Sequence, residues 1–124
     1  MANEKDWTVV FYADENGRCP IKEFLGSLDD KTQLELQWSI EQLRIRNIYA
    51  REPLVRPIAG KLWELREESN TNIYRLLYFF FTGRQIVFLH GFQKKSQKTS
   101  RGEIEIALQR LDKYVLKQKG VRYL

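Results

Sequence analysis

The sequence predicts a small α+β fold of one domain, and three observations lead to that prediction. The chain has 124 residues, and domains most often hold ~100–150 residues. Hydrophobic residues make up 43% of the chain and charged residues 30%, which is typical of a globular protein with a packed core. Strand and helix patterns follow one another in the order β-α-α-β-β-β-α. We expect one domain over residues 1–120 and a loose tail over residues 121–124.

The first half of the chain predicts one strand and two helices. Residues 7–12 alternate with period two, as a strand in a sheet requires. Pro20 suits the first turn of a helix, and apolar residues follow it at helical spacing: Ile21, Phe24, Leu25 and Leu28. A second helix, capped by Ser27 or Asp29, runs to about Arg46. Two apolar stripes on it predict broad packing against the sheet and the first helix: Leu36, Ile40 and Leu43, and beside them Leu34, Trp38 and Ile45.

The second half predicts an antiparallel meander packed against the helices. Residues 47–60 contain two prolines and Gly60, which indicates a connection without regular structure. Three strand patterns follow, separated by short polar turns that favour antiparallel pairing: residues 61–66, 73–81 and 85–92. The middle strand is apolar on both faces apart from Arg75, which predicts a central place in the sheet. Ser100 and Glu103 have capping-box spacing and predict a last helix that ends at Gly120.

Compartment and membrane contact are predicted from what the sequence lacks. The longest apolar run is six residues, at 76–81, whereas a bilayer-spanning helix needs ~20. The polar first residues do not resemble a secretion signal. A single cysteine, Cys19, cannot form an internal disulfide. We therefore expect a cytoplasmic protein without a membrane partner.

Basic charge is concentrated in the second half of the chain. The net charge is +5, but residues 1–60 hold 8 basic and 10 acidic residues, whereas residues 61–124 hold 13 and 6. Between Ser69 and Gly102 the sequence has six basic residues and no acidic one. Such a stretch favours a polyanionic partner, most commonly nucleic acid. A solvated basic face without a partner gives the same pattern.

Arg75 is the first candidate site residue. It is the one charged residue in the apolar middle strand, so it needs either an acidic partner or an anionic ligand. Glu64 on the neighbouring strand, or Glu67 or Glu68 in the following turn, could form a salt bridge with it. A bound phosphate group is the other explanation.

Residues 90–99 form a second candidate site at the end of the third meander strand. Phe92 could stack on a nucleobase, while the lysines of this segment neutralise phosphate groups: Lys94, Lys95 and Lys98. An ordinary basic loop with Phe92 in the core is the alternative. His90, the only histidine, suits a catalytic role and a structural hydrogen bond equally well. By strand parity we expect His90 to share a face with Ile86, Phe88 and Phe92.

Several other kinds of chemistry lack their motifs. The sequence has no glycine-rich phosphate loop, no serine-hydrolase motif and no Cys/His cluster at metal-ligand spacing. We therefore expect no cofactor and no metal site. A protein that cleaves phosphodiesters with these residues is expected to do so without a metal.

Three segments closely resemble the RelE/HigB-like toxins, specifically their phage-related branch. They are KLWELR at residues 61–66, IYRLLY at 73–78, and IVFLHGFQKK at 86–95 followed by Lys98 and Thr99. The resemblance covers residues 61–119, and it implies a RelE-like fold and the toxin of a type II toxin–antitoxin pair. Such a toxin is a ribosome-dependent endoribonuclease that cuts mRNA and inhibits translation. Its implied partners are the ribosome, mRNA and a helix-turn-helix antitoxin of the HigA kind.

The resemblance also implies roles for individual residues. In these toxins the 2′-hydroxyl of the mRNA attacks the adjacent phosphate, so the site needs cations, a base and a proton donor. The implied catalytic residues are Arg75, Arg66, His90 and Lys94, and the implied RNA-binding residues are Lys61, Phe92, Lys95, Lys98 and Arg101. Several relatives carry a catalytic tyrosine after the basic segment, where this chain has Ser96 and its neighbours. His90, or a lysine with a lowered pKa, is therefore the candidate acid or base.

A non-enzymatic function is the alternative. The ParE-like toxins share the fold but poison DNA gyrase by binding to it, and a fold alone does not decide function. Clustering of the basic residues on adjacent strand ends favours the ribonuclease, since an inhibitor that binds a protein would not need it.

Overall fold

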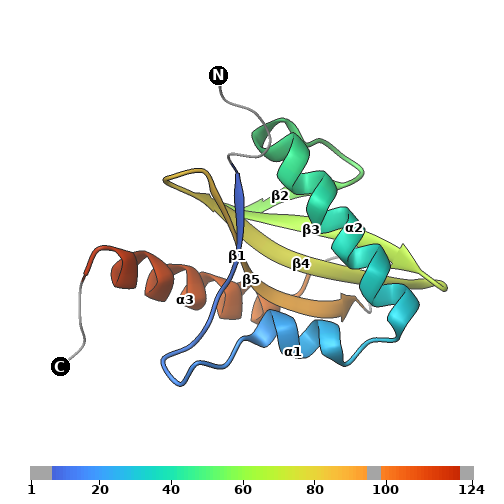
Figure 1. Ribbon diagram of the computed structural model, residues 1–124, viewed down its shortest axis with the longest axis horizontal. Coiled ribbons are helices and arrows are strands. Elements are labelled where there is room, and N and C mark those ends of the chain that lie inside the picture. The colour runs from blue at the N-terminus through green and yellow to red at the C-terminus, as the bar shows by residue number, and fades with distance from the viewer. Residues whose placement is uncertain (1–6, 95–98, 121–124) are drawn as a thin grey trace.

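The structure is a computed structural model that describes residues 7–94 and 99–120, and it confirms the α+β class. Five strands form one sheet in the order β1-β5-β4-β3-β2 (Figure 1). Their bounds are Thr8–Phe11 for β1, Val55–Ala59 for β2, Leu62–Ser69 for β3, Asn72–Phe81 for β4 and Gln85–Lys94 for β5. The predicted meander is confirmed, because β4 pairs antiparallel with both β3 and β5 and lies at the centre of the sheet. The first strand, β1, pairs parallel with β5.

The predicted helices are confirmed, and of the two cap residues considered for the second helix the structure has Asp29. The helices are α1 at Pro20–Gly26, α2 at Asp30–Arg46 and α3 at Arg101–Gln118, with a short 3₁₀ helix, η2, at Asn47–Tyr49. The Asp29 side chain accepts a hydrogen bond from the backbone N–H of Thr32, 2.7 Å away, and caps α2. Ser100 caps α3 by accepting from the backbone N–H of Glu103. None of the helices in the described part of the chain is long and apolar enough to cross a membrane.

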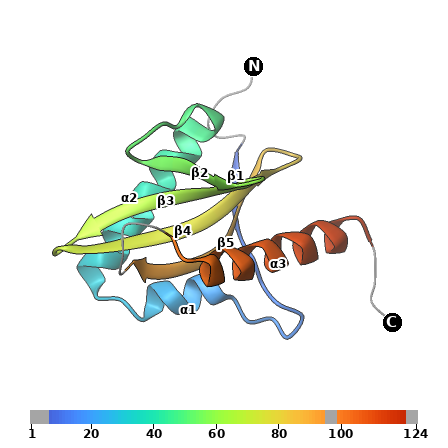
Figure 2. The ribbon, with the colours of Figure 1, turned by 180° about the vertical axis from the view of Figure 1, so that it is seen from behind.

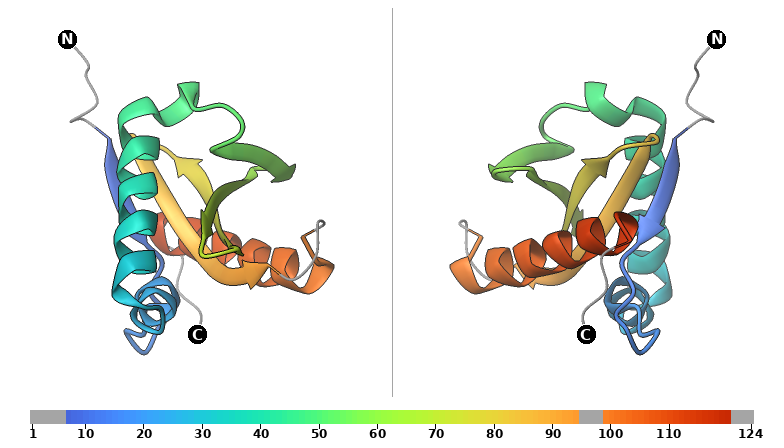
Figure 3. Two further views of the ribbon diagram at one scale, coloured as in Figure 1. Left: turned by 90° about the vertical axis from the view of Figure 1, so that its right-hand side faces the viewer. Right: turned by 90° about the vertical axis from the view of Figure 1, so that its left-hand side faces the viewer.

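The helices cover the two faces of the sheet unequally. Helices α1 and α2 pack on one face and α3 on the other (Figures 2 and 3). The α1/α2 face holds the larger apolar cluster, which includes Leu36, Leu76 and Phe88. The α3 face holds a second cluster with Phe79, Val87 and Leu111 among its members. Each strand therefore contributes alternate residues to two different cores.

Strand β2 corrects the prediction that residues 47–60 lack regular structure. Its residues pair antiparallel with β3, and the register shifts between Pro57 and Ala59. A proline is tolerated here because β2 is the edge strand, where an N–H turned to solvent is not needed for a sheet hydrogen bond. The element order therefore contains one more strand than the sequence predicted.

The packing predicted for one side of α2 is also wrong. Leu36, Ile40 and Leu43 are buried as expected. The neighbouring stripe is not: Leu34 and Trp38 are each 65% exposed, and Ile45 is 40% exposed. A helix on a sheet buries a limited arc, and here that arc holds only the first stripe.

The turn between β3 and β4 is shorter than predicted. Strand β3 extends to Ser69, which pairs with Asn72 and leaves a two-residue turn. Both turn residues, Asn70 and Thr71, have positive φ angles, 52° and 67°. Two-residue hairpin turns of type I′ require a positive φ at both positions. Glu67 and Glu68 therefore belong to a strand rather than to a turn.

Candidate nucleic-acid interface

Charged side chains gather on the α3 face, at the end of the sheet where α3 begins. Register places Arg66 of β3 opposite Arg75 of β4, and Arg75 opposite Phe92 of β5. Two residues further along the strands, Leu77 lies between Glu64 and His90. Residues opposite one another in an antiparallel sheet share a face. The meander thus brings the predicted residues of three strands together.

Glu64 is the centre of this charged cluster. Its side chain is fully buried and forms an ion pair with Arg75, which is 3% exposed. The Arg56 Nε donates to Glu64 Oε1 at 3.0 Å, and the Thr99 hydroxyl donates to Oε2 at 2.5 Å. Of the acidic partners considered for Arg75, the structure therefore selects Glu64. Two guanidinium groups share this one carboxylate, so the cluster keeps an excess of positive charge.

Electrostatics in the cluster favour an anionic ligand. Burial, and secondarily the Arg56 guanidinium, lower the pKa of Arg75 to about 10, so this group still carries its charge at neutral pH. The Nε atoms of Arg66 and Arg75 are buried without a hydrogen-bond partner among the described residues. Buried donors of this kind are normally satisfied. A bound phosphate would supply acceptors for them.

The arginines line a hollow of about 380 Å³ beside the sheet edge. Its walls are formed by strands β2 to β4 and the segment before β2: Glu52, Pro53, Val55, Arg56, Glu64, Arg66 and Arg75. Arg56 reaches it from β2, and 40% of its side chain stays exposed. Arg66 pairs with Glu68 at 2.5 Å and is 37% exposed. Part of each side chain is therefore accessible from solvent.

Lys94 ends β5 next to these arginines. It is 8% exposed, and burial, with Arg75, Arg56 and Arg66 as further causes, lowers its pKa to about 8. A lysine with such a pKa exchanges its proton near neutral pH, which an ordinary surface lysine does not. The amine therefore suits acid–base chemistry, which was the second of the two assignments predicted from the sequence.

A β-bulge determines where His90 points. The register between β4 and β5 shifts so that Leu77 faces His90 and Tyr78 faces Phe88, which leaves Leu89 as the extra residue. His90 therefore shares the α3 face with Phe92, as predicted, but not with Ile86 and Phe88, which lie in the α1/α2 core. Bulges redirect side chains in this way because the extra residue changes the alternation.

His90 contacts α3 through both ring nitrogens. Its Nε2 lies 2.7 Å from Glu103 Oε1, and its Nδ1 lies 3.3 Å from a terminal nitrogen of Arg110. The ring also stacks on Phe92, with the centroids 5.5 Å apart. Phe92 itself packs partly against the α3-face core. The structure thus places both side chains between the sheet and the first turns of α3.

Two predicted RNA-binding residues lie outside the cluster. Lys61 is exposed in the turn between β2 and β3 and is not among the residues that line the hollow. The Arg101 side chain is 92% exposed and pairs with Glu105 of its own helix at 3.1 Å. Lys95 and Lys98, the other two predicted lysines, lie outside the described residues, as does the predicted tail at 121–124.

Sequence reasoning missed Arg56 as a member of the site. Alternation of Val55, Arg56, Pro57 and Ile58 is a strand signal, but the prolines and Gly60 hid it. Thr99 lies in the predicted segment 90–99, but its contact with Glu64 was not predicted, because it joins residues 35 positions apart. Among the described residues, no three His, Cys, Asp or Glu side chains come together as a possible metal-ion site.

Similar sequences among known proteins identify the family of this chain. Residues 23–112 match the model of the family described as phage-derived protein Gp49-like. The chain is also 32% identical over 100 residues to the probable endoribonuclease HigB1 of two Mycobacterium tuberculosis strains, CDC 1551 / Oshkosh and H37Rv. That alignment covers 81% of this chain and 78% of the relative. The chain therefore belongs to the Gp49-like family and is related to the HigB/RelE-like toxins.

Proposed function

We propose that this protein is the toxin of a type II toxin–antitoxin pair and cleaves mRNA on the ribosome without a metal. Family membership and the relative named as a probable endoribonuclease support ribonuclease chemistry. The observation that carries the proposal is the charged cluster, in which Arg56 and Arg75 pair with the buried Glu64 while Arg66 and Lys94 lie nearby. A cluster with this excess of positive charge suits the phosphates of RNA.

The proposed reaction uses the 2′-hydroxyl of the RNA as its nucleophile. The 2′-oxygen bonds to the adjacent phosphorus, its proton passes to a base, and the bond to the 5′-oxygen of the next nucleotide breaks as that oxygen takes up a proton. The products are a 2′,3′-cyclic phosphate and a 5′-hydroxyl. Arg75 and Arg66 stabilise the charge that develops on the phosphate oxygens. Arg56, which the sequence did not indicate, joins them in binding phosphate.

Acid–base chemistry is assigned to Lys94. Its lowered pKa, about 8, allows it to lose a proton near neutral pH and to return one afterwards. His90 has both ring nitrogens directed at α3, so we assign it the role of holding Phe92 and the start of that helix in place. Phe92 offers an aromatic ring at the border of the cluster for base stacking.

The proposed partners follow from the family. A toxin of this kind is silenced by an antitoxin, and a helix-turn-helix protein of the HigA kind is the partner we propose, with the ribosome and mRNA as targets in the cytoplasm. We also assign phosphate contacts to Lys61, Lys95, Lys98 and Arg101 as the RNA extends beyond the hollow.

The test is to induce the protein in growing cells and to map mRNA 5′ ends. Wild type is expected to produce cleavages within translated frames, and Arg75→Ala is expected to abolish them. His90→Ala is expected to weaken them less. Arg18→Ala is the matched control, since Arg18 is an exposed arginine that pairs with Glu23 far from the cluster in sequence. Growth arrest with intact mRNA would contradict the proposal and favour a ParE-like inhibitor of gyrase.

A further inference from the structure

A second hollow adjoins the first and is not used by the proposed reaction. It has a volume of about 520 Å³ and lies between α2, β3 and the segment before β2. Glu52, Pro53 and Arg66 line both hollows, so the two lie next to each other. An RNA strand bound with one phosphate at Arg75 therefore has a neighbouring space for an adjacent nucleotide.

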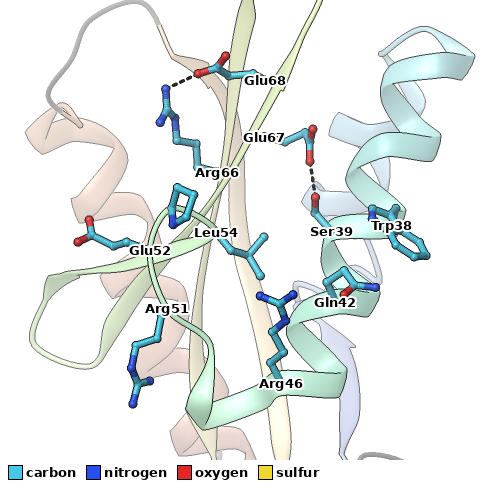
Figure 4. A pocket seen from close by; sticks show the side chains of 11 residues that line it. Trp38, Ser39, Gln42, Arg46, Arg51, Glu52, Leu54, Arg66, Glu67 and Glu68 are labelled. Atoms are coloured by element: carbon cyan, nitrogen blue, oxygen red, sulfur yellow. Dashed lines mark hydrogen bonds and ion pairs between the residues drawn. The ribbon is translucent and has the colours of Figure 1, made fainter.

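The walls of the second hollow combine an apolar side with charged groups. Pro53 and Leu54 are apolar members of its lining. Arg46, on α2, directs its guanidinium toward the same space as Leu54 (Figure 4). Single-stranded RNA bases bind between apolar groups and flat guanidinium planes. This composition suits a base more than a phosphate group alone.

Glu67 lines this hollow and is partly buried. The hydroxyl of Ser39, which is 5% exposed, donates a hydrogen bond to its carboxylate (Figure 4). A carboxylate has about four acceptor positions, so this bond orients it and leaves acceptors for a ligand. Two parallel donors are the best match to one carboxylate. Among the RNA bases only guanine presents two adjacent donors, N1–H and N2–H₂, on its pairing edge.

We propose that the second hollow binds a guanine base of the RNA next to the cleaved phosphate, with Glu67 as the residue that recognises it. This inference rests on the proposed function, because it takes the ligand to be part of the same RNA strand. Ser39 acts as a positioning residue for Glu67, and Arg66 spans both hollows and binds the phosphate between the two nucleotides.

Direct binding tests the site without any cleavage. The full chain is titrated with 5′-GMP and 5′-AMP while backbone amide signals are followed by NMR. GMP is expected to shift the signals of Ser39, Leu54 and Glu67 and to bind more tightly than AMP. Glu67→Gln is expected to weaken GMP binding about 5- to 150-fold, the range for losing one bidentate base contact. Glu35→Gln is the matched control. The charge of Glu35 acts on Glu67, but Glu35 does not line the hollow.

Each outcome decides the inference. Equal binding of GMP and AMP, or unchanged GMP binding by Glu67→Gln, overturns it. The melting temperature of Glu67→Gln, in which the amide oxygen still accepts from Ser39, checks that the variant is folded. Mapping of RNA ends separates the two proposals. Wild type that binds GMP through Glu67 but cuts no RNA refutes the proposed function and leaves the guanine site standing. Wild type that cuts RNA with the same base preference as Glu67→Gln refutes the guanine site alone.

Discussion

The two faces of the sheet differ most at the end where α3 begins. On the α1/α2 face two facing positions of β3 and β4 are apolar, and both side chains, Leu65 and Leu76, are fully buried. On the α3 face the adjacent positions of the same strands are Glu64 and Arg75, buried as an ion pair. Burying charges costs free energy that the pair itself does not reliably recover. The comparison indicates that one face stabilises the strands, while the other uses their fixed positions to hold a charged site.

Leu76→Ala tests the stabilising face and has the largest expected effect. Leu76 is fully buried in the α1/α2 core, and removing its side chain leaves a cavity, so the free energy of unfolding should fall by ~2–5 kcal/mol. Denaturant unfolding measures this loss. Cleavage per folded molecule should stay near that of wild type, and a large loss of activity in the folded fraction would show that the two faces are not separable.

Arg75→Ala tests the charged face one residue away. Removing one group that stabilises developing phosphate charge should lower the cleavage rate by about 10²–10³. Arg75→Lys keeps the charge but loses the planar fork, so we expect it to recover only part of the rate. Single-turnover cleavage of ribosome-bound mRNA measures both variants. A rate for Arg75→Ala close to that of wild type would remove Arg75 from the proposed site.

Gly91→Ala tests how closely α1 approaches the sheet. A Cβ atom at this position would lie 2.6 Å from Phe24 Cδ2 and 2.8 Å from Leu76 Cδ2, so these side chains must move. We expect a loss of ~1–3 kcal/mol in the free energy of unfolding, measured by thermal denaturation. Gly102→Ala is the matched control, because no atom lies within 4 Å of its added Cβ. Equal stability of the two variants would contradict the close packing of α1.

Sequence patterns predicted the stabilising face better than the charged face. Period-two and helical spacing identify residues such as Leu36 and Leu76 because burial repeats regularly along an element. Arg75 stood out for the opposite reason, as a charge inside an apolar strand. Its partner could be limited to three glutamates but not chosen, since the choice depends on register and on where β3 ends.

Features that break the regular pattern could not be predicted in this way. The bulge at Leu89 inverts the expected alternation, and it alone decides which residues share a face with His90. Strand β2 was hidden by prolines that only an edge position tolerates. Arg56 reaches Glu64 from the neighbouring strand, 8 positions away, and Thr99 reaches it from 35 positions away, and both contacts exist only once the sheet has formed.

The pH dependence of cleavage, which we attribute to Lys94, is the smallest expected effect. It is also the one that most sharpens the contrast between the two faces. With a pKa of about 8, a base at this position should make cleavage rise about tenfold per pH unit below that value and level off above it. Lys94→Arg keeps a cation that does not lose its proton, so its profile should be flat and low. A wild-type profile without a bend near pH 8 would assign the proton transfer to another group.

The pH dependence of the free energy of unfolding tests the pKa of Lys94 independently. The pKa of Lys94 is lower in the folded chain than the ordinary value of 10.5, so the unfolded chain binds more protons between about pH 8 and 10.5. The contribution of Lys94 to the free energy of unfolding should therefore rise with pH across this window. In Lys94→Met that contribution is absent, and the difference between the two unfolding curves isolates it. Leu76→Ala removes no titratable group, so it should lower the whole stability curve without changing its slope with pH.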